Sequence, residues 1–160
     1  MGKEHHYSLT IEWTGNKGTG TNDYRSYERS HIISAPNKTS ISGSSDPAFR
    51  GDNTKFNPEE LLLASISSCH MLWFLHLCAD SGIIISDYKD EPTGIMVESA
   101  GGGGHFQEVT LHPKVVIAGS KLPDEDKLDL LQVKANKHCF ISNSVNFPVG
   151  HQAVYSLSQD

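Results

Sequence analysis

The sequence predicts an α+β fold, because strand-like and helix-like patterns alternate along the chain without internal repeats. Alternating apolar residues near the N-terminus indicate strands. The segment from Asn57 to Gly82 carries the start and stop signals of one long helix, and residues 122–139 form a second helical pattern with strand-like segments on both sides. A chain of 160 residues suits one domain, so we expect a single domain over residues 1–160.

The N-terminal third is expected to be β structure followed by a loop. Residues 6–13, "HYSLTIEW", alternate between apolar and polar side chains, as a half-buried strand does. The apolar side chains of this strand are Tyr7, Leu9, Ile11 and Trp13. Two further strands are expected within residues 22–34 and 38–42. Residues 43–56 are rich in Gly, Ser, Asp and Asn and contain Arg50, and long loops inside compact domains are often functional.

The long helix has clear end signals. It begins with Asn57 as N-cap, Pro58 at the first position and Glu60 three residues after the cap, which together resemble a capping box. Gly82 ends it, as a glycine after the last turn often does. The helix is apolar on nearly every face, which indicates that protein surrounds it. A small domain rarely covers a helix on all sides, so a second chain is the natural supplier of the missing cover.

The C-terminal half combines strands with the second helix. Residues 82–99 are expected to form two strands joined by a turn. "GGGGH" at 101–105 fits a flexible hairpin better than a phosphate cradle, since a strand rather than a helix follows it. Residues 105–119 are expected to be one strand, with Pro113 at an edge or bulge, and residues 151–158 close the chain. The apolar faces of that strand and of the second helix are expected to carry Val109, Leu111, Val115, Ile117, Leu128, Leu131 and Ala135.

Composition excludes several classes of function. The net charge of −6 argues against nucleic acid as a partner, since phosphate contacts need a basic surface. The N-terminus has no apolar stretch typical of a signal peptide. Within the long helix only Met71–Leu77 is strongly apolar, which is too short to span a bilayer. Three cysteines do not make a secreted disulfide framework. We therefore expect a cytoplasmic protein without a nucleic-acid or membrane partner.

The cysteines and histidines of the long helix are poorly spaced for a metal site. Cys69 and Cys78 lie nine residues apart, about half a turn out of phase, and His70 and His76 also diverge. We expect neither a metal nor another cofactor.

The same geometry prevents a disulfide within the helix. Cys69 and Cys78 are separated along the axis by about 13 Å, whereas a disulfide needs Cα atoms within about 7 Å. If Cys69 forms an intrachain disulfide, Cys139 is the most plausible partner, and Cys78 then packs in the core. Spacing alone equally allows all three cysteines to be inert core residues, because buried cysteines are common.

Polar neighbours favour a reactive Cys69 over an inert one. These neighbours are Ser67, Ser68 and His70. A reactive thiol must become a thiolate, which needs a nearby cation because burial alone raises the thiol pKa. The available arginines are Arg25, Arg29 and Arg50. Arg50 precedes the helix, where Glu59 or Glu60 could orient it.

A distance argument adds a condition to this assignment. Glu59 lies ten residues before Cys69, about 15 Å along a straight helix and beyond the reach of its side chain. If Glu59 and Arg50 serve Cys69, they must reach it from another chain. The all-round apolar helix points the same way, so we expect a homodimer with sites at its interface.

Two segments carry a resemblance to a known family. "NPEELLLASISSCH", with its cysteine ten residues after the first glutamate, closely resembles the hallmark of the OsmC/Ohr family of organic hydroperoxide reductases. "HCFISNSV" resembles the family's second cysteine segment, which usually reads like "CPVS". The order of strands and helices agrees with the family over nearly the whole chain.

The resemblance implies a fold and a mechanism. It implies an intertwined homodimer in which antiparallel sheets wrap long central helices. It implies that Cys69 attacks the hydroperoxide and becomes a sulfenic acid, and that Cys139 resolves it as a disulfide, which an external dithiol then reduces. An arginine and a glutamate activate the thiolate in the family, and Glu59 matches the glutamate of the "NPE" motif.

The resemblance leaves the arginine open. "FRGD" before "NPE" resembles the arginine segment of the OsmC branch and favours Arg50, whereas the Ohr branch carries its arginine in the early hairpin, where Arg25 is the closest candidate. The sequence also departs from the pattern, since no proline follows Cys139 and His70, a possible auxiliary residue, follows Cys69. These departures indicate a less characterised branch.

We therefore expect a cofactor-independent peroxidase that reduces organic hydroperoxides in a stress response. Apolar residues expected near Cys69 would favour alkyl substrates, and they are Leu72, Trp73 and Phe140. The reductant is expected to be a dithiol of the lipoyl or thioredoxin type. The alternatives are a dimer that binds a small apolar ligand or senses redox state with little turnover, and a structural dimer with inert cysteines.

Overall fold

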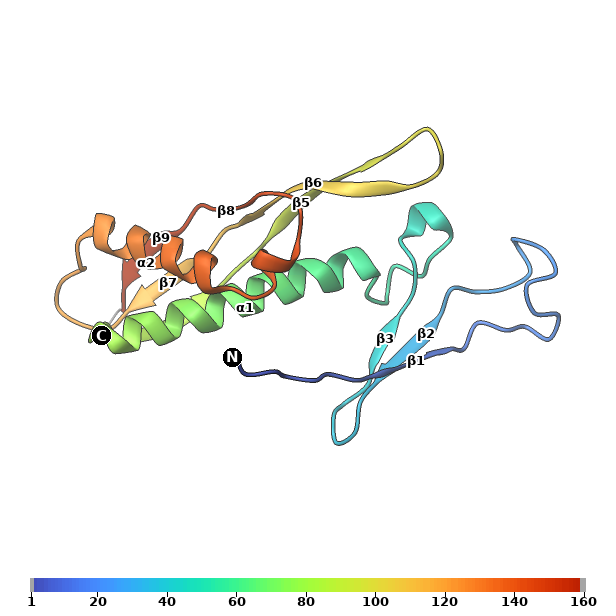
Figure 1. Cartoon of the computed structure of the whole chain (residues 1–160), viewed down its shortest axis with the longest axis horizontal. Helices are drawn as coiled ribbons and strands as arrows, with labels where there is room; N and C mark the ends of the chain where they lie inside the picture. Colours follow the sequence, from blue (N-terminus) through green and yellow to red (C-terminus); the bar gives the residue numbers. More distant parts are fainter. Residues whose placement is uncertain (1, 159–160) are drawn as a thin grey trace. The chain divides into compact units, whose positions relative to one another are not determined.

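Strands and two helices alternate along the chain in the computed structural model, which describes residues 2–158 (Figure 1). This mixed content confirms the predicted α+β class. The chain divides into two units, Met1–Leu62 and Leu63–Asp160, here called unit 1 and unit 2, and each is described by itself. The single domain over residues 1–160 stays a prediction.

Unit 1 holds a small antiparallel sheet in the order β1-β2-β3. Its strands are β1 (Thr10–Trp13), β2 (His31–Ser34) and β3 (Ile41–Gly43), and a short 3-10 turn, η1 (Pro47–Phe49), follows them. The expectation of a half-buried first strand is wrong for the single chain, because all four residues of β1 are exposed. The exposed fractions are 91% for Tyr7, 59% for Leu9, 64% for Ile11 and 42% for Trp13.

The helix α1 (Pro58–Asp80) starts in unit 1 and continues into unit 2, and its ends confirm the predicted signals. The Asn57 side chain accepts a hydrogen bond from the backbone N–H of Glu60 at 2.7 Å, and the Glu60 carboxylate accepts one from the N–H of Asn57 at 3.0 Å. This reciprocal pair is a capping box. Gly82 has a φ of 71°, the left-handed conformation that ends many helices.

In unit 2, a second helix and two sheets lie against one side of α1. The further elements are β4 (Ile85–Lys89), β5 (Thr93–Glu98), β6 (Gly104–Leu111), β7 (Lys114–Ile117), α2 (Glu125–His138), η2 (Ser142–Ser144), β8 (Val149–His151) and β9 (Val154–Leu157). The sheets have the orders β4-β7-β9 and β5-β6-β8. The expected antiparallel pairing is present in β4–β7 and β5–β6, and the sheets are mixed because β8 runs parallel to β6 and β9 runs parallel to β7. The segment containing α2 separates each parallel pair and supplies the crossover that parallel strands need.

Two segments expected to be single strands are broken in the same way. Residues 105–119 divide at His112 and Pro113 into β6 and β7, which lie in different sheets. Asp90 accepts the backbone N–H of His112 at 2.6 Å, and Pro113 has no N–H to donate to a ladder. Residues 151–158 divide at Gln152 beside this break, where Gln152 donates to the carbonyl of Leu111 at 2.8 Å.

The core of unit 2 lies where one line of α1 meets α2 and the sheets. The buried residues of α1 recur every four positions and are Ile66, His70, Phe74 and Cys78. The predicted apolar faces of the strand and of α2 are confirmed, since their residues Val109, Leu111, Val115, Ile117, Leu128, Leu131 and Ala135 are all buried. These positions match the helical period and the alternation of strands.

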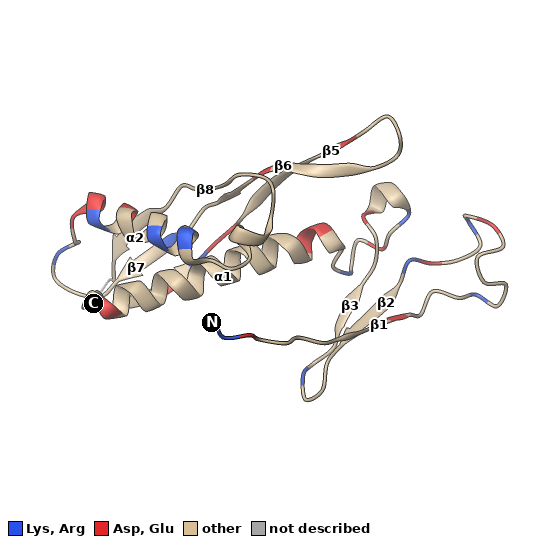
Figure 2. Ribbon diagram, in the orientation of Figure 1, with Lys and Arg blue, Asp and Glu red and all other residues tan. Residues whose placement is uncertain are grey.

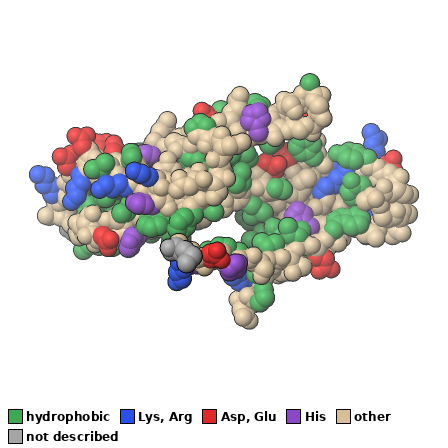
Figure 3. Space-filling view, in the orientation of Figure 1, with side chains coloured by type: hydrophobic (Ala, Val, Ile, Leu, Met, Phe, Trp, Pro, Cys, Tyr) green, Lys and Arg blue, Asp and Glu red, His purple; other side chains and the backbone are tan. Residues whose placement is uncertain are grey.

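The rest of α1 is not covered within the single chain. Leu72 is 62% exposed, so one chain by itself leaves part of α1 uncovered, and the cover expected from a second chain stays a prediction. Hydrophobic side chains reach the surface along α1 in the space-filling view (Figure 3). By length and composition alone, α1 is long and apolar enough to cross a membrane, which the expectation limited to Met71–Leu77 did not foresee. The core helix of a soluble protein passes the same test.

Candidate active site

Two thiols from different helices meet in unit 2. Cys69 lies on α1 and Cys139 at the C-terminal end of α2, and the two thiols lie close enough that Cys139 affects the pKa of Cys69. Both are free thiols, with Cys139 fully buried and Cys69 partly exposed. The fold therefore places together the two cysteines that the sequence separates by 70 residues.

Backbone N–H groups after α2 point at both sulfurs. The N–H of Ser142 donates to Cys139 Sγ at 3.3 Å, and the N–H groups of Ile141 and Phe140 lie near enough to the Cys69 sulfur to lower its pKa. The chain adopts this turn because the extended backbone of Cys139, with ψ of 112°, ends α2 and leads into η2. Backbone N–H groups near the two sulfurs favour negative charge there.

The pKa of Cys69 is nevertheless raised within the single chain. Burial is the largest cause, and the hydrogen bond to Cys139 raises the pKa further. The N–H groups of Ile141 and Phe140 lower it without reversing the shift. Figure 2 shows that α1 carries neither Lys nor Arg between its acidic start and Asp80, so its own helix supplies no permanent cation. Activation of this thiol therefore needs a positive charge from elsewhere.

Three aromatic side chains, here called the aromatic cluster, lie beside the thiol pair: Trp73, His138 and Phe140. Trp73 follows Cys69 by one helical turn, on the same face of α1. The His138 ring stacks on the Trp73 ring with centroids 5.0 Å apart, and the Phe140 ring meets it edge-on at 6.1 Å. His138 and Phe140 are the immediate neighbours of Cys139 in the chain. The predicted apolar surroundings of Cys69 thus include this cluster.

Cys78 lies apart from the thiol pair, in the core, as expected. It is fully buried among the residues that pack α1 against α2, and burial raises its pKa to about 11. A thiol with so high a pKa is almost entirely protonated at neutral pH and is a poor nucleophile.

His70 contacts the core rather than the thiols. Its Nε2 atom hydrogen-bonds to the Gln132 side chain of α2 at 2.7 Å, and its ring lies 6.0 Å from that of His151. Burial lowers the pKa of His70, although the Gln132 hydrogen bond opposes the shift. No contact among the described residues joins His70 to Cys69, so an auxiliary role in the chemistry stays a prediction without geometric support.

The charged residues predicted to activate the thiol belong to unit 1. Arg50 and Arg25 both line one polar cavity of about 320 Å³. Within residues 2–158 neither guanidinium forms an ion pair, whereas the two acids of the cavity bind lysines: Lys17 pairs with Glu28 at 2.7 Å and Lys55 with Asp52 at 3.0 Å. Both candidate arginines are therefore available to an anion, and their shared cavity leaves the choice between them open.

Backbone geometry fixes the turn that carries Arg50, and one carboxylate oxygen of Glu59 is buried. Arg50 has a φ of 67°, a left-handed conformation that costs a non-glycine residue roughly 1–2 kcal/mol. A Cβ atom on the following Gly51 would lie 1.5 Å from the carbonyl oxygen of Ser45, so the turn that presents Arg50 requires glycine there. The Oε2 atom of Glu59 is buried without a hydrogen-bond partner in the described chain. A buried carboxylate oxygen without a donor is costly, so a donor to this oxygen would stabilise the protein.

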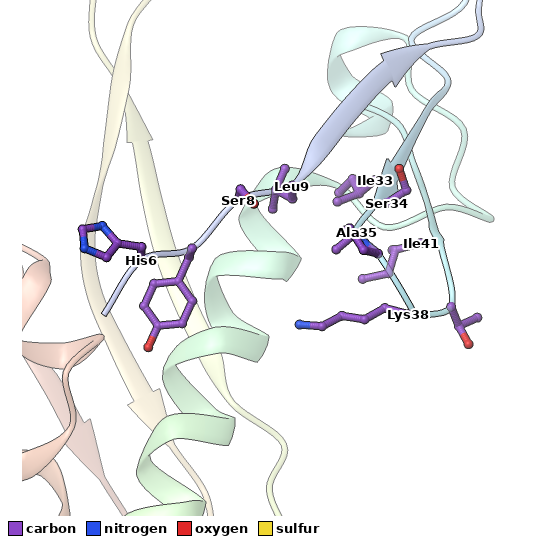
Figure 4. Close-up of a pocket in the computed structure, with 11 residues that line it drawn as sticks. His6, Ser8, Leu9, Ile33, Ser34, Ala35, Lys38 and Ile41 are labelled. Carbon is purple, nitrogen blue, oxygen red and sulfur yellow. The ribbon is translucent and has the colours of Figure 1, made fainter. Parts of the chain in front are cut away.

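A second, more apolar cavity of about 560 Å³ lies beside the sheet of unit 1 (Figure 4). Its lining side chains include His6, Leu9, Ile33, Ala35, Lys38 and Ile41. They come from the segment before β1 and from the β2–β3 hairpin, with the Lys38 ammonium as the cation of the lining. Among residues 2–158, no group of three or more His, Cys, Asp or Glu side chains is gathered as metal ligands would be.

Sequence reasoning missed two features of the site. The N–H groups of Phe140, Ile141 and Ser142 carry no side-chain signal, and only a turn signal after α2 could have indicated them. The stacking of His138 on Trp73 joins residues far apart in the chain, so no local pattern announces it. The N–H groups affect the two sulfurs, and the stacking holds the residue next to Cys139 against α1.

The long central helix of this α+β fold carries a cysteine with a second thiol beside it. This arrangement limits the families of proteins to which the chain can belong. The chain belongs to the family described as OsmC-like protein, whose model matches residues 51–152. The family consists of soluble proteins, and some structural neighbours of this chain are organic hydroperoxide resistance proteins.

Individual relatives are distant. An uncharacterized protein of Bacillus subtilis, YmaD, is 29% identical over 143 residues, which are 89% of this chain and 87% of that protein. A solved OsmC-like protein of unknown function from Vibrio cholerae is 28% identical, with a TM-score of 0.86 over 94% of this chain and 100% of that one. An organic hydroperoxide resistance protein from Elizabethkingia anophelis is 19% identical, with a TM-score of 0.66 over 98% of this chain and 100% of that one, and supports the fold alone.

Proposed function

We propose that this protein is a cysteine-based peroxidase that reduces organic hydroperoxides. The observation that carries the proposal is that the Cys69 and Cys139 thiols, from different helices, lie beside each other, with the backbone N–H of Ser142 donating to Cys139 Sγ. Cys69 is the partly exposed member of the pair and can meet a peroxide, whereas Cys139 is buried behind it. Membership of a family with hydroperoxide resistance proteins among its structural neighbours supports the same reaction.

The reaction takes two steps on the protein. The Cys69 thiolate attacks the terminal oxygen of R–O–O–H, the O–O bond breaks, and Cys69 becomes a sulfenic acid while RO⁻ leaves and takes a proton as the alcohol. The Cys139 thiolate then attacks the sulfenic sulfur and releases hydroxide, which is protonated to water, leaving a Cys69–Cys139 disulfide. An external dithiol, of the lipoyl or thioredoxin type, reduces this disulfide by thiol–disulfide exchange.

The active unit is a homodimer in this proposal. Cys69 lacks a permanent cation on its own helix, while Arg50, Arg25 and the buried Glu59 oxygen in unit 1 lack partners among the described residues. The exposed apolar row of unit 1 and the uncovered side of α1 would supply the contact area. Arg50 of one chain, oriented by Glu59, then lowers the pKa of the other chain's Cys69. We place the protein in the cytoplasm, where thiols are kept reduced.

The test compares the wild type with two single substitutions. Cys69→Ser is expected to lower the rate of cumene hydroperoxide reduction by at least about a hundredfold, because serine is not nucleophilic without a dedicated base. Cys78→Ser removes the unrelated thiol and is expected to retain the wild-type rate. A Cys69→Ser protein as fast as the wild type would show that the mechanism is wrong.

A redox sensor or apolar-ligand-binding protein with little turnover is the second candidate. The raised pKa of Cys69 favours slow oxidation, and the 560 Å³ cavity of unit 1 offers an apolar binding site. Stoichiometric peroxide that leaves Cys69 unoxidised, together with a small apolar ligand retained in native mass spectrometry, would favour this candidate over the peroxidase.

A further inference from the structure

The segment around Cys139 is held against α1 by aromatic contacts on both sides of the cysteine. His138, just before Cys139, stacks on Trp73 with ring centroids 5.0 Å apart, and Phe140, just after it, meets the same ring at 6.1 Å. The His138 and Phe140 side chains are otherwise exposed, and Phe140 is 71% exposed. Trp73 is therefore the point at which both neighbours of Cys139 contact the helix that carries Cys69.

Stacked and edge-on aromatic pairs contribute free energy beyond their buried area. Because Trp73 lies one turn beyond Cys69 on the same face of α1, contacts to Trp73 fix the position of Cys139 relative to Cys69. The buried hydrogen bond between Gln132 and His70 also joins α2 to α1, about two helical turns before Cys139, whereas the bonds nearest to Cys139 are local. The backbone N–H of Cys139 donates to the carbonyl of Ala135 at 2.9 Å, and the Asn143 side chain donates to the carbonyl of Lys137 at 3.0 Å, but both bonds stay within the α2–η2 segment.

We propose that Trp73 is a positioning residue for the resolving step, acting through His138 and Phe140 to hold Cys139 at the sulfur of Cys69. This inference rests on the proposed peroxidase chemistry for its biological use, but the positioning itself does not require peroxide. Trp73 raises the effective concentration of the Cys139 thiol at Cys69. Without it, the sulfenic acid on Cys69 lasts longer and reacts with a second hydroperoxide, whose oxygen converts the sulfenic to the sulfinic acid while the alcohol leaves.

The first experiment measures effective concentration by equilibrating the protein with reduced and oxidised glutathione, which form the Cys69–Cys139 disulfide without any peroxide. Trp73→Ala is expected to lower the effective concentration by about tenfold or more, since orientation of the reacting groups is lost. Trp73→Phe keeps an aromatic ring and is expected to recover most of it. Val133→Ala removes an exposed apolar side chain of α2 outside the aromatic cluster and is expected to match the wild type.

The second experiment counts products after one to ten equivalents of cumene hydroperoxide. Mass spectrometry is expected to show more Cys69 sulfinic acid and less disulfide in Trp73→Ala, while the rate of the first oxidation changes less than about threefold. A general loosening of the structure would slow both steps and would not move the product ratio in this direction. If Trp73→Ala does not fold, the double substitution of the exposed His138 and Phe140 by alanine carries the same test.

The outcomes separate the two hypotheses. An effective concentration in Trp73→Ala within twofold of the wild type, or a loss in Val133→Ala as large as in Trp73→Ala, would overturn the positioning role. A wild-type protein that forms the disulfide with glutathione but not with peroxide would contradict the peroxidase alone, and a loss in Trp73→Ala under glutathione would still support the positioning role.

Discussion

Unit 2 and unit 1 differ in how far each is completed by its own residues. Unit 2 buries its predicted apolar faces, places two thiols beside each other and directs the backbone N–H of Ser142 at one of them. Within residues 2–158, unit 1 leaves the apolar side chains of its first strand exposed, two arginines without ion pairs and a buried glutamate oxygen without a donor. The proposed redox pair therefore has both of its thiols within one unit, whereas the proposal takes the activating charge from unit 1 of another chain.

The largest expected effect tests whether unit 1 of one chain acts on the Cys69 thiol of another. Arg50→Ala is expected to lower peroxidase activity by about ten- to a hundredfold, since the cation that lowers the pKa of Cys69 is lost. Mixed dimers of Arg50→Ala and Cys69→Ser chains are expected to regain activity, because one site then combines an intact Cys69 with the other chain's Arg50. Activity assays on mixtures refolded together check this.

Arg25→Ala is the matched variant for that assay, because Arg25 lines the same cavity. Complementation by Arg50→Ala with no loss in Arg25→Ala assigns the role to Arg50. Mixtures that stay as inactive as either parent would contradict action between chains.

The next effect concerns the stability of unit 2 and its buried histidine. Burial lowers the pKa of His70, so the unfolded chain binds this proton at a higher pH than the folded one. The contribution of neutral His70 to the free energy of unfolding is therefore complete above the unfolded pKa near 6.5, and it is lost as the pH drops through the folded pKa.

Gln132→Ala removes the hydrogen-bond partner of the His70 ring and is expected to lower the free energy of unfolding by about 1–3 kcal/mol.

Urea unfolding at pH 8 and at pH 5 measures both effects. His70→Gln is expected to weaken the dependence on pH between these values, although the similarly shifted His151 retains part of it. A protein more stable at pH 5 than at pH 8 would contradict the buried neutral state of His70.

The smallest expected effect sharpens the contrast between the two thiols of α1. Cys78 has a pKa of about 11, so about 0.1% of it is thiolate at pH 8. Iodoacetamide is expected to leave Cys78 unmodified in the native protein over a time in which the more exposed Cys69 reacts. Peptide mass mapping reports the order, and equal labelling of the two in the native state would place Cys78 outside the core.

Sequence patterns predicted those parts of the fold that depend on local periodicity and end signals. The capping box at Asn57, the end of α1 near Gly82 and the buried faces of β6, β7 and α2 follow from side chains a few residues apart. The breaks at Pro113 and Gln152 were missed, because they depend on hydrogen bonds from Asp90 and between neighbouring strands.

The candidate site was likewise predictable where it depends on local helical periodicity and not where it depends on tertiary contacts. Helical phase separated Cys69 from Cys78, and the fold places Cys78 in the core. The stacking of His138 on Trp73 and the N–H groups that face the sulfurs depend on tertiary contacts and backbone conformation, which one sequence does not display. The alternation of apolar and polar residues in the first strand predicts one buried face, but the strand is exposed in the single chain. The alternation does not indicate whether the same chain or another chain covers that face.

The central claim is that Cys69 and Cys139 form one redox pair. The most direct measurement is intact mass and disulfide mapping after one equivalent of cumene hydroperoxide, with the Cys78→Ser protein as control. The account predicts a loss of two hydrogens and a single Cys69–Cys139 disulfide in both proteins. A product in which Cys69 stays reduced, or in which the disulfide involves Cys78, would contradict it.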